Sequence, residues 1–297
     1  KDAERVTIDT MNYIAEMKAR GNTVLVGVDT GFEELNKMTT GFGKGDLVII
    51  AARPAMGKTS LVLNMVQNLI DQGKGVAFFS LEMPAEQLML RLLSIKTSVG
   101  LQKLRVGDMD DDQWSRLNKA VEEMQHSKLF VDDHGSLNIN QLRSKLRKLK
   151  GKHPEIELCV VDYLQIMSGT GTKDRHLEVS EMSRGLKMLA RELEMPIIAL
   201  SQLNRGLESR NDKRPMLSDL RESGSIEQDA DVVMFIHRED KMNKDKEAER
   251  PNIAEILVEK HRNGPVGHAE LYFDGTHVRF LNLDTHHAAA PGAGDDF

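Results

Sequence analysis

One stretch decides the fold of this chain: residues 52–60 read Ala52-Arg53-Pro54-Ala55-Met56-Gly57-Lys58-Thr59-Ser60. It follows the apolar run 47–51 and precedes the amphipathic stretch 61–66, an order typical of strand, loop and helix. The pattern is that of a P-loop, G-x-x-x-x-G-K-[ST], except that Ala52 occupies the first glycine position. The stretch therefore predicts a phosphate-binding loop at the start of a helix.

Such a loop suits a triphosphate because backbone N–H groups and the helix dipole both favour an anion there. Lys58 is expected to reach the β- and γ-phosphates, and the Thr59 hydroxyl to coordinate Mg²⁺. A glycine-rich turn with a chance Gly-Lys-Thr is the alternative, which the flanking segments disfavour. Ala52 must avoid the backbone conformations that only glycine adopts easily. The loop thus indicates nucleotide binding without saying which reaction the nucleotide drives.

The composition is that of an ordinary globular chain: 297 residues, 40% hydrophobic and 29% charged, enough for one large domain or two small ones. The net charge of −6 argues against a protein that is basic all over, although local basic loops can still bind a phosphate backbone. The single cysteine, Cys159, lies in an apolar run and predicts a buried thiol. No stretch has membrane-spanning length and no signal peptide is visible, so we expect a cytoplasmic protein without a membrane partner.

Short apolar runs alternate with helical stretches over most of the chain, which predicts an α/β fold. The strands after the P-loop are expected near residues 76–81, 129–131, 158–162, 196–201 and 232–236. Helices are expected near residues 86–98, 111–126, 140–150 and 176–194. Continuous apolar strands separated by helices indicate a mostly parallel central sheet covered by helices. Short strands and an Asn263-Gly264-Pro265 turn within 253–282 predict C-terminal β-hairpins at the edge of that sheet.

The two ends of the chain are expected to lie outside this core. Residues 3–20 predict a helix, because Ile8, Met11, Ile14 and Met17 recur at helical spacing. Its apolar face can pack on its own domain or on a neighbouring molecule, and its place ahead of the first core strand favours the neighbour. We therefore expect a linker helix over 1–21, a main domain over 22–285 and a disordered tail over 286–297. The almost wholly charged segment 238–252 is expected to be a solvated excursion.

Two carboxylates, Asp162 and Glu82, each end a predicted strand. Ligands in open α/β sheets bind beyond the carboxyl ends of the strands, so both side chains are placed to act on the phosphates. Asp162 can hold Mg²⁺, usually through water, and the alternative is a buried carboxylate that caps the next turn. Glu82 can orient and deprotonate an attacking water, and the alternative is a carboxylate that caps the helix 86–98.

Arg91 and Gln202 are further candidates near the phosphates. Arg91 lies between Leu90 and Leu92 and needs an anionic partner, for which a structural carboxylate and a nucleotide are equally suitable. Gln202 follows a predicted strand and has both a donor and an acceptor, so it can sense the γ-phosphate. An ordinary surface glutamine is the alternative for Gln202.

A basic segment, Lys260-His261-Arg262-Asn263-Gly264, lies at an expected hairpin tip. An isolated basic tip is commonly just solvated. In an oligomeric ATPase, however, Arg262 can reach the γ-phosphate of the next subunit as an arginine finger. The sequence does not say which subunit Arg262 serves.

Taken together, these segments resemble the C-terminal motor domain of the bacterial replicative DNA helicases of the DnaB family. The likeness covers nearly the whole chain, and Ala-Arg-Pro-x-Met-Gly-Lys-Thr is the usual P-loop of that family, so Ala52 fits. The other matching motifs follow in order: Thr30-Gly31-Phe32, Leu35-Asn36, Thr40-Gly41-Phe42, Gly45-Asp46-Leu47, Ser80-Leu81-Glu82-Met83, Val161-Asp162-Tyr163-Leu164-Gln165, Leu200-Ser201-Gln202-Leu203-Asn204-Arg205 and Lys260-His261-Arg262-Asn263-Gly264. Several ordered motifs are far more specific than any one of them.

The resemblance implies a RecA-like P-loop NTPase fold in a homohexameric ring, with ATP and Mg²⁺ bound between subunits. It implies ATP hydrolysis that drives 5′→3′ translocation on single-stranded DNA and duplex unwinding at the replication fork. The implied ATP contacts are Arg53, Pro54, Ala55, Met56, Gly57, Lys58, Thr59, Ser60 and Arg91 of one subunit, with Lys260, His261 and Arg262 of the next. The implied catalytic residues are Lys58, Glu82, Gln202, Lys260 and Arg262, and the implied metal ligands are Thr59 and Asp162.

The resemblance also implies that Arg221, Glu222 and Gly224 grip the DNA backbone in the centre of the ring. Five basic and three acidic side chains in 204–221 are compatible with this role, whereas the Glu222 carboxylate would repel a phosphate, so its contact should use main-chain N–H. The stretch 204–224 has no aromatic residue, so DNA binding should be indifferent to sequence and weakened by salt. Family members carry an N-terminal domain, and the full-length protein is expected to meet primase and a helicase loader in the primosome.

Two other functions compete with the helicase motor. One is a RecA-like strand-exchange recombinase, against which the segments 80–83 and 220–225 favour the helicase. The other is a non-catalytic nucleotide switch that only assembles rings, against which Glu82 and Arg262 argue.

Overall fold

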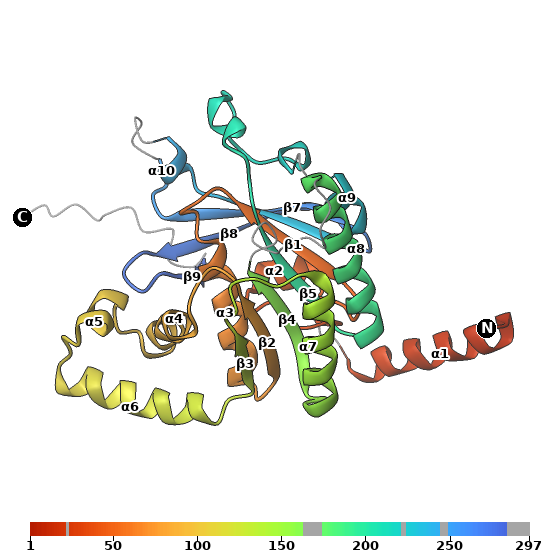
Figure 1. Cartoon of the computed structure of the whole chain (residues 1–297), viewed down its shortest axis with the longest axis horizontal. Helices are drawn as coiled ribbons and strands as arrows, with labels where there is room; N and C mark the ends of the chain where they lie inside the picture. Colours follow the sequence, from red (N-terminus) through yellow and green to blue (C-terminus); the bar gives the residue numbers. More distant parts are fainter. Residues whose placement is uncertain (22–23, 163–173, 221–223, 244–248, 284–297) are drawn as a thin grey trace, which may run out of the picture.

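The strands of the computed structural model form one sheet in the order β3-β2-β4-β5-β1-β6-β7-β8-β9 (Figure 1). The structure describes residues 1–21, 24–162, 174–220, 224–243 and 249–283. Six strands run parallel: β3 (Leu129–Asp132), β2 (Gly75–Ser80), β4 (Ile156–Asp162), β5 (Ile197–Gln202), β1 (Leu47–Ala52) and β6 (Val232–His237). Three antiparallel strands follow: β7 (Ile253–His261), β8 (Gly267–Asp274) and β9 (Arg279–Asn282). The predicted α/β fold with C-terminal hairpins is confirmed.

Helices cover both faces of this sheet, and the first helix extends away from it. They are α1 (Ala3–Ala19), α2 (Glu33–Thr39), α3 (Lys58–Asp71), α4 (Ala85–Thr97), α5 (Leu101–Val106), α6 (Asp111–Gln125), α7 (Ile139–Lys152), α8 (Arg175–Leu193), α9 (Gly224–Asp229) and α10 (Glu239–Met242). Short 3₁₀ helices lie at Arg205–Ser209 and Leu217–Asp219. The sequence did not predict α2 and α5, which have seven and six residues and are too short for a clear helical period.

Strand β1 shows why the sheet is apolar throughout. Its residues alternate between two cores, since Val48 and Ile50 pack with the side chains of α3 and α4, whereas Leu47 and Ile49 pack with those of α7 and α8. A strand covered on both faces has no polar side, which explains its continuous apolar run. Cys159 in β4 is fully buried, as predicted.

The parallel strands bring their carboxyl ends to one edge of the sheet. Ala52 at the end of β1 pairs with Gln202 at the end of β5, and Ser80 at the end of β2 pairs with Asp162 at the end of β4. The carboxyl ends of β1, β2, β4 and β5 therefore share this edge, where the sequence predicted a nucleotide.

Helix α1 extends away from the body of the molecule (red in Figure 1) and buries none of its residues. Its apolar side chains Ile8, Met11 and Ile14 are 49%, 59% and 51% exposed, so its apolar face packs on nothing in the described part of this chain. The expected tail over 286–297 and the motif residues 163–165 lie outside the described residues. Within the described part of the charged segment 238–252, Arg238 departs from the expected solvation, because it is only 2% exposed.

Candidate nucleotide-binding site

The predicted P-loop has the backbone that phosphate binding needs. Gly57 adopts φ 97° as the N-cap of α3, a conformation that glycine alone takes without strain. Ala52 is the last residue of β1, where the extended backbone suits any residue, so the missing first glycine has no structural cost. The loop instead takes a second positive φ at Ala55, 65°. The N–H groups at the start of α3 thus follow directly on a tight turn.

The C-terminal hairpin supports the loop from behind. A Cβ atom added to Gly57 would lie 2.7 Å from Cζ of Phe280 in β9. The Phe280 N–H donates to Oδ1 of Asn64 in α3 at 2.9 Å, and its ring lies 5.0 Å from that of Phe273, centroid to centroid. This contact fixes the loop against an element more than two hundred residues away, and the sequence did not predict it.

A pocket of about 360 Å³ opens over the loop at the carboxyl edge of the sheet. Its lining contains ten predicted residues, Arg53, Pro54, Ala55, Gly57, Lys58, Thr59, Ser60, Glu82, Arg91 and Gln202. Phe273 and Val278 complete the lining and were not predicted. Met56 was predicted as a nucleotide contact but is 5% exposed and packs into the core. The structure therefore brings most of the candidate residues to one cavity.

The metal candidates Thr59 and Asp162 are neighbours. The Thr59 hydroxyl donates to Oδ2 of Asp162 at 3.3 Å, and the Asp162 side chain is fully buried. Its other oxygen, Oδ1, accepts no hydrogen bond from a described residue. Burial raises the pKa of Asp162 to about 6, although the Lys58 charge opposes this rise. A buried carboxylate oxygen without a partner beside a threonine hydroxyl fits Mg²⁺, which prefers hard oxygen ligands.

Lys58 is half-buried and lies near two carboxylates. Burial lowers the pKa of its ammonium group, while the charges of Asp162 and Glu82 partly restore it. No group of three or more His, Cys, Asp or Glu side chains in the described residues can hold a metal ion. A magnesium ion at Thr59 and Asp162 would thus need phosphate and water oxygens for its remaining ligands.

The alternatives to a functional role lose support at Glu82 and Arg91. Helix α4 has Pro84 as its N-cap, and the Ala85 N–H donates to Oδ2 of Asp133 at 3.0 Å, so the helix-capping role considered for Glu82 is wrong. Arg91 has no ion pair or hydrogen bond with any residue that the structure describes, although its charge lowers the pKa of Asp162. A structural carboxylate partner for Arg91 is therefore absent from the described residues.

The Arg53 side chain of the P-loop is already engaged within the chain. Its Nε donates to Oε1 of Glu208 at 2.8 Å, and Nη1 donates to the carbonyl of Leu203 at 2.5 Å. The side chain is 9% exposed. These bonds tie the P-loop to the segment that follows β5, so Arg53 has fewer donors left for a phosphate.

The basic segment 260–262 lies at the opposite edge of the sheet. Arg262 follows β7 and lies beside Asp231, which directly precedes β6. The P-loop follows the other end of β1, and a strand of six residues spans about 20 Å at 3.3 Å per residue. Lys260, His261 and Arg262 consequently do not line the pocket of this chain.

The predicted DNA contacts are only partly described. Arg221 and Glu222 lie outside the described residues, whereas Gly224 begins α9 and has nothing within 4 Å of an added Cβ. In the preceding segment, Arg210 makes two bonds to Asp219, of 2.7 and 2.8 Å. Arg214 likewise donates to Glu255 at 2.5 Å. Part of the basic charge counted in 204–221 is thus neutralised inside the chain.

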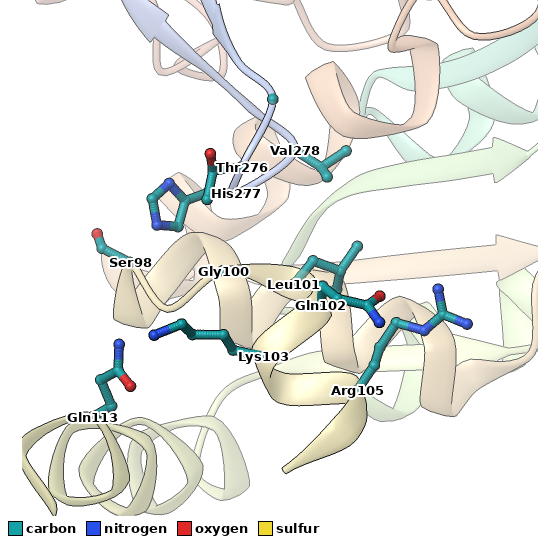
Figure 2. A pocket seen from close by; sticks show the side chains of 11 residues that line it. Ser98, Gly100, Leu101, Gln102, Lys103, Arg105, Gln113, Thr276, His277 and Val278 are labelled. Carbon is teal, nitrogen blue, oxygen red and sulfur yellow. The ribbon is translucent and has the colours of Figure 1, made fainter. Parts of the chain in front are cut away.

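A second pocket, of about 570 Å³, lies between α5 and the turn that joins β8 to β9 (Figure 2). Figure 2 shows Thr276, His277 and Val278 of the turn on one side and Lys103 of α5 on the other. Val278 lines both this pocket and the P-loop pocket, and its φ of 52° is strained for a β-branched residue. No local sequence pattern predicted this turn.

None of the helices in the described residues is long and apolar enough to cross a membrane.

Comparisons with known proteins agree with this geometry. The family profile described as DnaB-like helicase C terminal domain matches residues 27–282. The chain is 44% identical to the replicative DNA helicase DnaB of Helicobacter pylori (strain ATCC 700392 / 26695) over 321 residues and 45% identical to that of Geobacillus stearothermophilus over 287 residues. Both alignments cover 96% of this chain but only 66% and 62% of the relatives, so the chain spans less than two thirds of their length.

Two solved structures share the fold. One is described as an ATPase domain, with a TM-score of 0.87, 39% identity and coverage of 93% of this chain and 98% of that one. The other is described as a DnaB-like replicative helicase and its interactions with primase, with a TM-score of 0.86, 39% identity and coverage of 93% and 66%. The predicted RecA-like fold therefore has close structural counterparts.

Proposed function

Because this chain belongs to the family of DnaB-like helicase C-terminal domains, we propose that it is the ATP-driven motor of a replicative DNA helicase. One observation carries the proposal: the pocket at the carboxyl edge of the sheet joins a P-loop to Glu82, Arg91 and Gln202. A loop that only bound a phosphate would not need an exposed carboxylate beside it, nor an arginine that pairs with no described residue.

ATP binds with its triphosphate on the N–H groups that open α3, and Lys58 pairs with the β- and γ-phosphates. Thr59 and Asp162 would hold Mg²⁺, whose positive charge would offset the negative charge of the phosphates. The remaining contacts on this subunit come from Arg53, Pro54, Ala55, Met56, Gly57, Ser60 and Arg91, where Met56 would use its main chain because its side chain packs into the core. These roles are supported by Oδ1 of Asp162 and the guanidinium of Arg91, neither of which has a partner among the described residues.

Glu82 is the general base that orients and deprotonates the attacking water. Two observations support this role for Glu82. The side chain is exposed at the pocket, and it does not cap the described start of α4. Gln202 senses the γ-phosphate and transmits its presence to the segment that begins at Asn204. That segment is tied to the P-loop by the bonds of Arg53 to Leu203 and Glu208.

Arg262 acts on the ATP of a neighbouring subunit, together with Lys260 and His261. The support is geometric, because these residues lie at the opposite end of β1 from the pocket of their own chain. Since a side chain cannot cross the sheet, the finger and the P-loop of one chain serve two different sites. The unpacked apolar face of α1 supports the same kind of assembly, with α1 as the linker helix that docks on the neighbour.

The assembly is a homohexameric ring around single-stranded DNA. Arg221, Glu222 and Gly224 contact the sugar-phosphate backbone of that DNA. Translocation runs 5′→3′, by analogy with the family, and the longer protein meets primase and a helicase loader in the cytoplasm. The named relatives are replicative helicases, and one structural relative is described together with primase.

The test is DNA-stimulated ATPase activity measured beside the oligomeric mass of the chain. We expect single-stranded DNA to raise ATP turnover of a ring-sized species and high salt to weaken the effect. Turnover by a monomer, or no response to DNA, would contradict the motor. Forked substrates with one blocked tail test the polarity, and opening that requires only a free 3′ tail would overturn it. Homologous pairing without unwinding would favour a strand-exchange recombinase instead.

A further inference from the structure

The carboxylate of Asp231 lies at the amino end of β1 and has both oxygens engaged. Oδ1 accepts from Nη1 of Arg262 at 3.0 Å, and Oδ2 accepts from Nζ of Lys187 at 2.6 Å and from the Leu47 N–H at 2.8 Å. Its side chain is 5% exposed. A buried carboxylate between two cations is costly to remove, because its partners would be left unpaired.

The backbone holds this carboxylate in one place. The Asp231 N–H donates to the carbonyl of Leu47 at 2.9 Å, and the Arg262 N–H donates to the carbonyl of Asp231 at 2.8 Å. Asp231 is thus bonded through main chain to the start of β1 and to the residue whose side chain it also holds. Lys187 in α8 adds a third element, since it also donates to the carbonyl of Gly45 at 2.8 Å.

The guanidinium of Arg262 is fixed on one side and open on the other. Nη1 binds Asp231, and Nη2 donates to the carbonyl of Gln228 at 2.8 Å. The side chain is 44% exposed, and its other N–H groups have no partner in the described residues. A guanidinium has five N–H donors in a planar fork, so those that remain face away from the chain in a fixed direction.

We propose that Asp231 is a positioning residue that presents Arg262 to the phosphates of the neighbouring copy. This inference rests on the proposed function, in which Arg262 acts between subunits. An exposed arginine without a bonded carboxylate samples many rotamers. A misplacement of a catalytic group by about 1 Å can lower the reaction rate about 10²-fold. Asp231 therefore sets the orientation of the finger without touching the nucleotide.

A purely structural role is the competing explanation. Asp231 also anchors β1 to β6, and β1 leads to the P-loop of the same chain, so its loss could damage the local ATP site instead. The two explanations differ in which subunit is impaired. A positioning role impairs the site of the neighbour, whereas damage along β1 impairs the site of the same chain.

The test uses Asp231→Asn, which keeps an oxygen for the Leu47 N–H but loses the charge that holds Arg262. Because this leaves Lys187 without its anion, the double variant Asp231→Asn with Lys187→Gln is made as well. We expect both to lower kcat for ATP about 10²-fold with little change in KM, since their own pockets stay intact. Lys187→Gln alone should lower the melting temperature while turnover stays near that of the parent chain.

Mixed assemblies then identify the impaired subunit. Each Asp231 variant is co-expressed with Lys58→Ala, which lacks the P-loop lysine but keeps Arg262. The two variants carry different affinity tags, and purification on both tags selects assemblies that contain both. Random mixing pairs an intact P-loop with an intact finger at about one interface in four, so activity should recover towards about a quarter of the parent value. Damage along β1 would leave every interface inactive.

Arg262→Ala mixed with Lys58→Ala is the matched control. Recovery with Arg262→Ala but not with the Asp231 variants would overturn the positioning role alone. Failure of the Arg262→Ala mixture to recover would overturn the shared site of the proposed function itself. Recovery in both mixtures would support both.

Discussion

The charged side chains at the two ends of β1 differ in whether they have partners among the described residues. At the carboxyl end, the guanidinium of Arg91 and Oδ1 of Asp162 have no partner among the described residues, and Glu82 is exposed. At the amino end, Asp231 accepts bonds from Arg262 and from other donors, and both of its oxygens are engaged.

This difference shows two ways to prepare a group for a ligand. The carboxyl end leaves charged groups without partners among the described residues, and in the proposed function the phosphates and the metal would supply those partners. At the amino end, Asp231 and the carbonyl of Gln228 pair with the guanidinium of Arg262, which fixes the direction of its outward-facing N–H groups. If this comparison is right, substitutions at the carboxyl end should change ligand binding or chemistry, whereas those at the amino end should change stability or the neighbouring site.

The largest effect is expected for Arg262→Ala. Removing an arginine finger lowers ATP turnover by about 10³–10⁵ in reference systems, and the variant should still assemble and bind ATP. Steady-state kinetics and oligomeric mass measure this. Arg250→Ala is the matched control, because it removes an arginine that is 56% exposed and whose one partner among the described residues is Glu270. Full activity in pure Arg262→Ala assemblies would show that ATP turnover does not need Arg262, which would contradict the role given to the amino end of β1.

Glu82→Gln tests the carboxyl end. The amide cannot accept the proton of the attacking water, so kcat should fall about 10²–10⁴-fold while ATP binding persists. Glu86→Gln, an exposed carboxylate four residues further on, is the control and should leave turnover unchanged. Normal turnover of Glu82→Gln would place the base elsewhere.

Arg91→Gln and Lys187→Gln compare the two ends directly. Loss of Arg91 should weaken ATP binding about ten-fold, the value of one charged hydrogen bond, and leave the melting temperature unchanged. Loss of Lys187 should do the reverse, because its partner Asp231 is buried. Nucleotide titrations and thermal melts on the same samples decide this, and a lower melting temperature for Arg91→Gln would show that it has a structural partner.

The smallest effect is expected for Gly57→Ala compared with Gly73→Ala. Both glycines have positive φ, 97° and 76°, so each alanine should cost about 1 kcal/mol of unfolding free energy through backbone strain. At Gly57 the added Cβ also meets Phe280 at 2.7 Å, whereas at Gly73 it meets nothing within 4 Å. A further cost of about 1 kcal/mol at Gly57 is therefore expected in denaturant titrations. Equal costs would mean that Phe280 moves aside.

The sequence predicted those parts of the site that lie at strand ends. Glu82, Asp162 and Gln202 each follow an apolar run, and the rule that parallel strands end at one edge is enough to group them with the P-loop. That rule needs no knowledge of side-chain packing. The change in strand pattern after residue 252 also predicted correctly that the hairpins lie at the edge of the sheet.

The rest of the site depends on contacts that no local pattern reveals. Phe273, Val278 and Phe280 belong to the last two strands and their turn, whose apolar residues indicate burial but not that they pack on the P-loop. Asp231 had a faint signal, a carboxylate directly before an apolar strand, but at the amino end of that strand. Arg238 was hidden in a charged run, although it is stacked 4.0 Å above the Phe273 ring.

Arg262 and Lys58 lie at opposite ends of β1, and this placement determines how many complete ATP sites an assembly of copies can have. If each site needs a loop from one copy and a finger from the next, an open row of copies always has one unused loop and one unused finger. Closing the row adds a working site without adding a copy. Every ATPase centre of such a motor can be complete only when the chain of subunits has no ends.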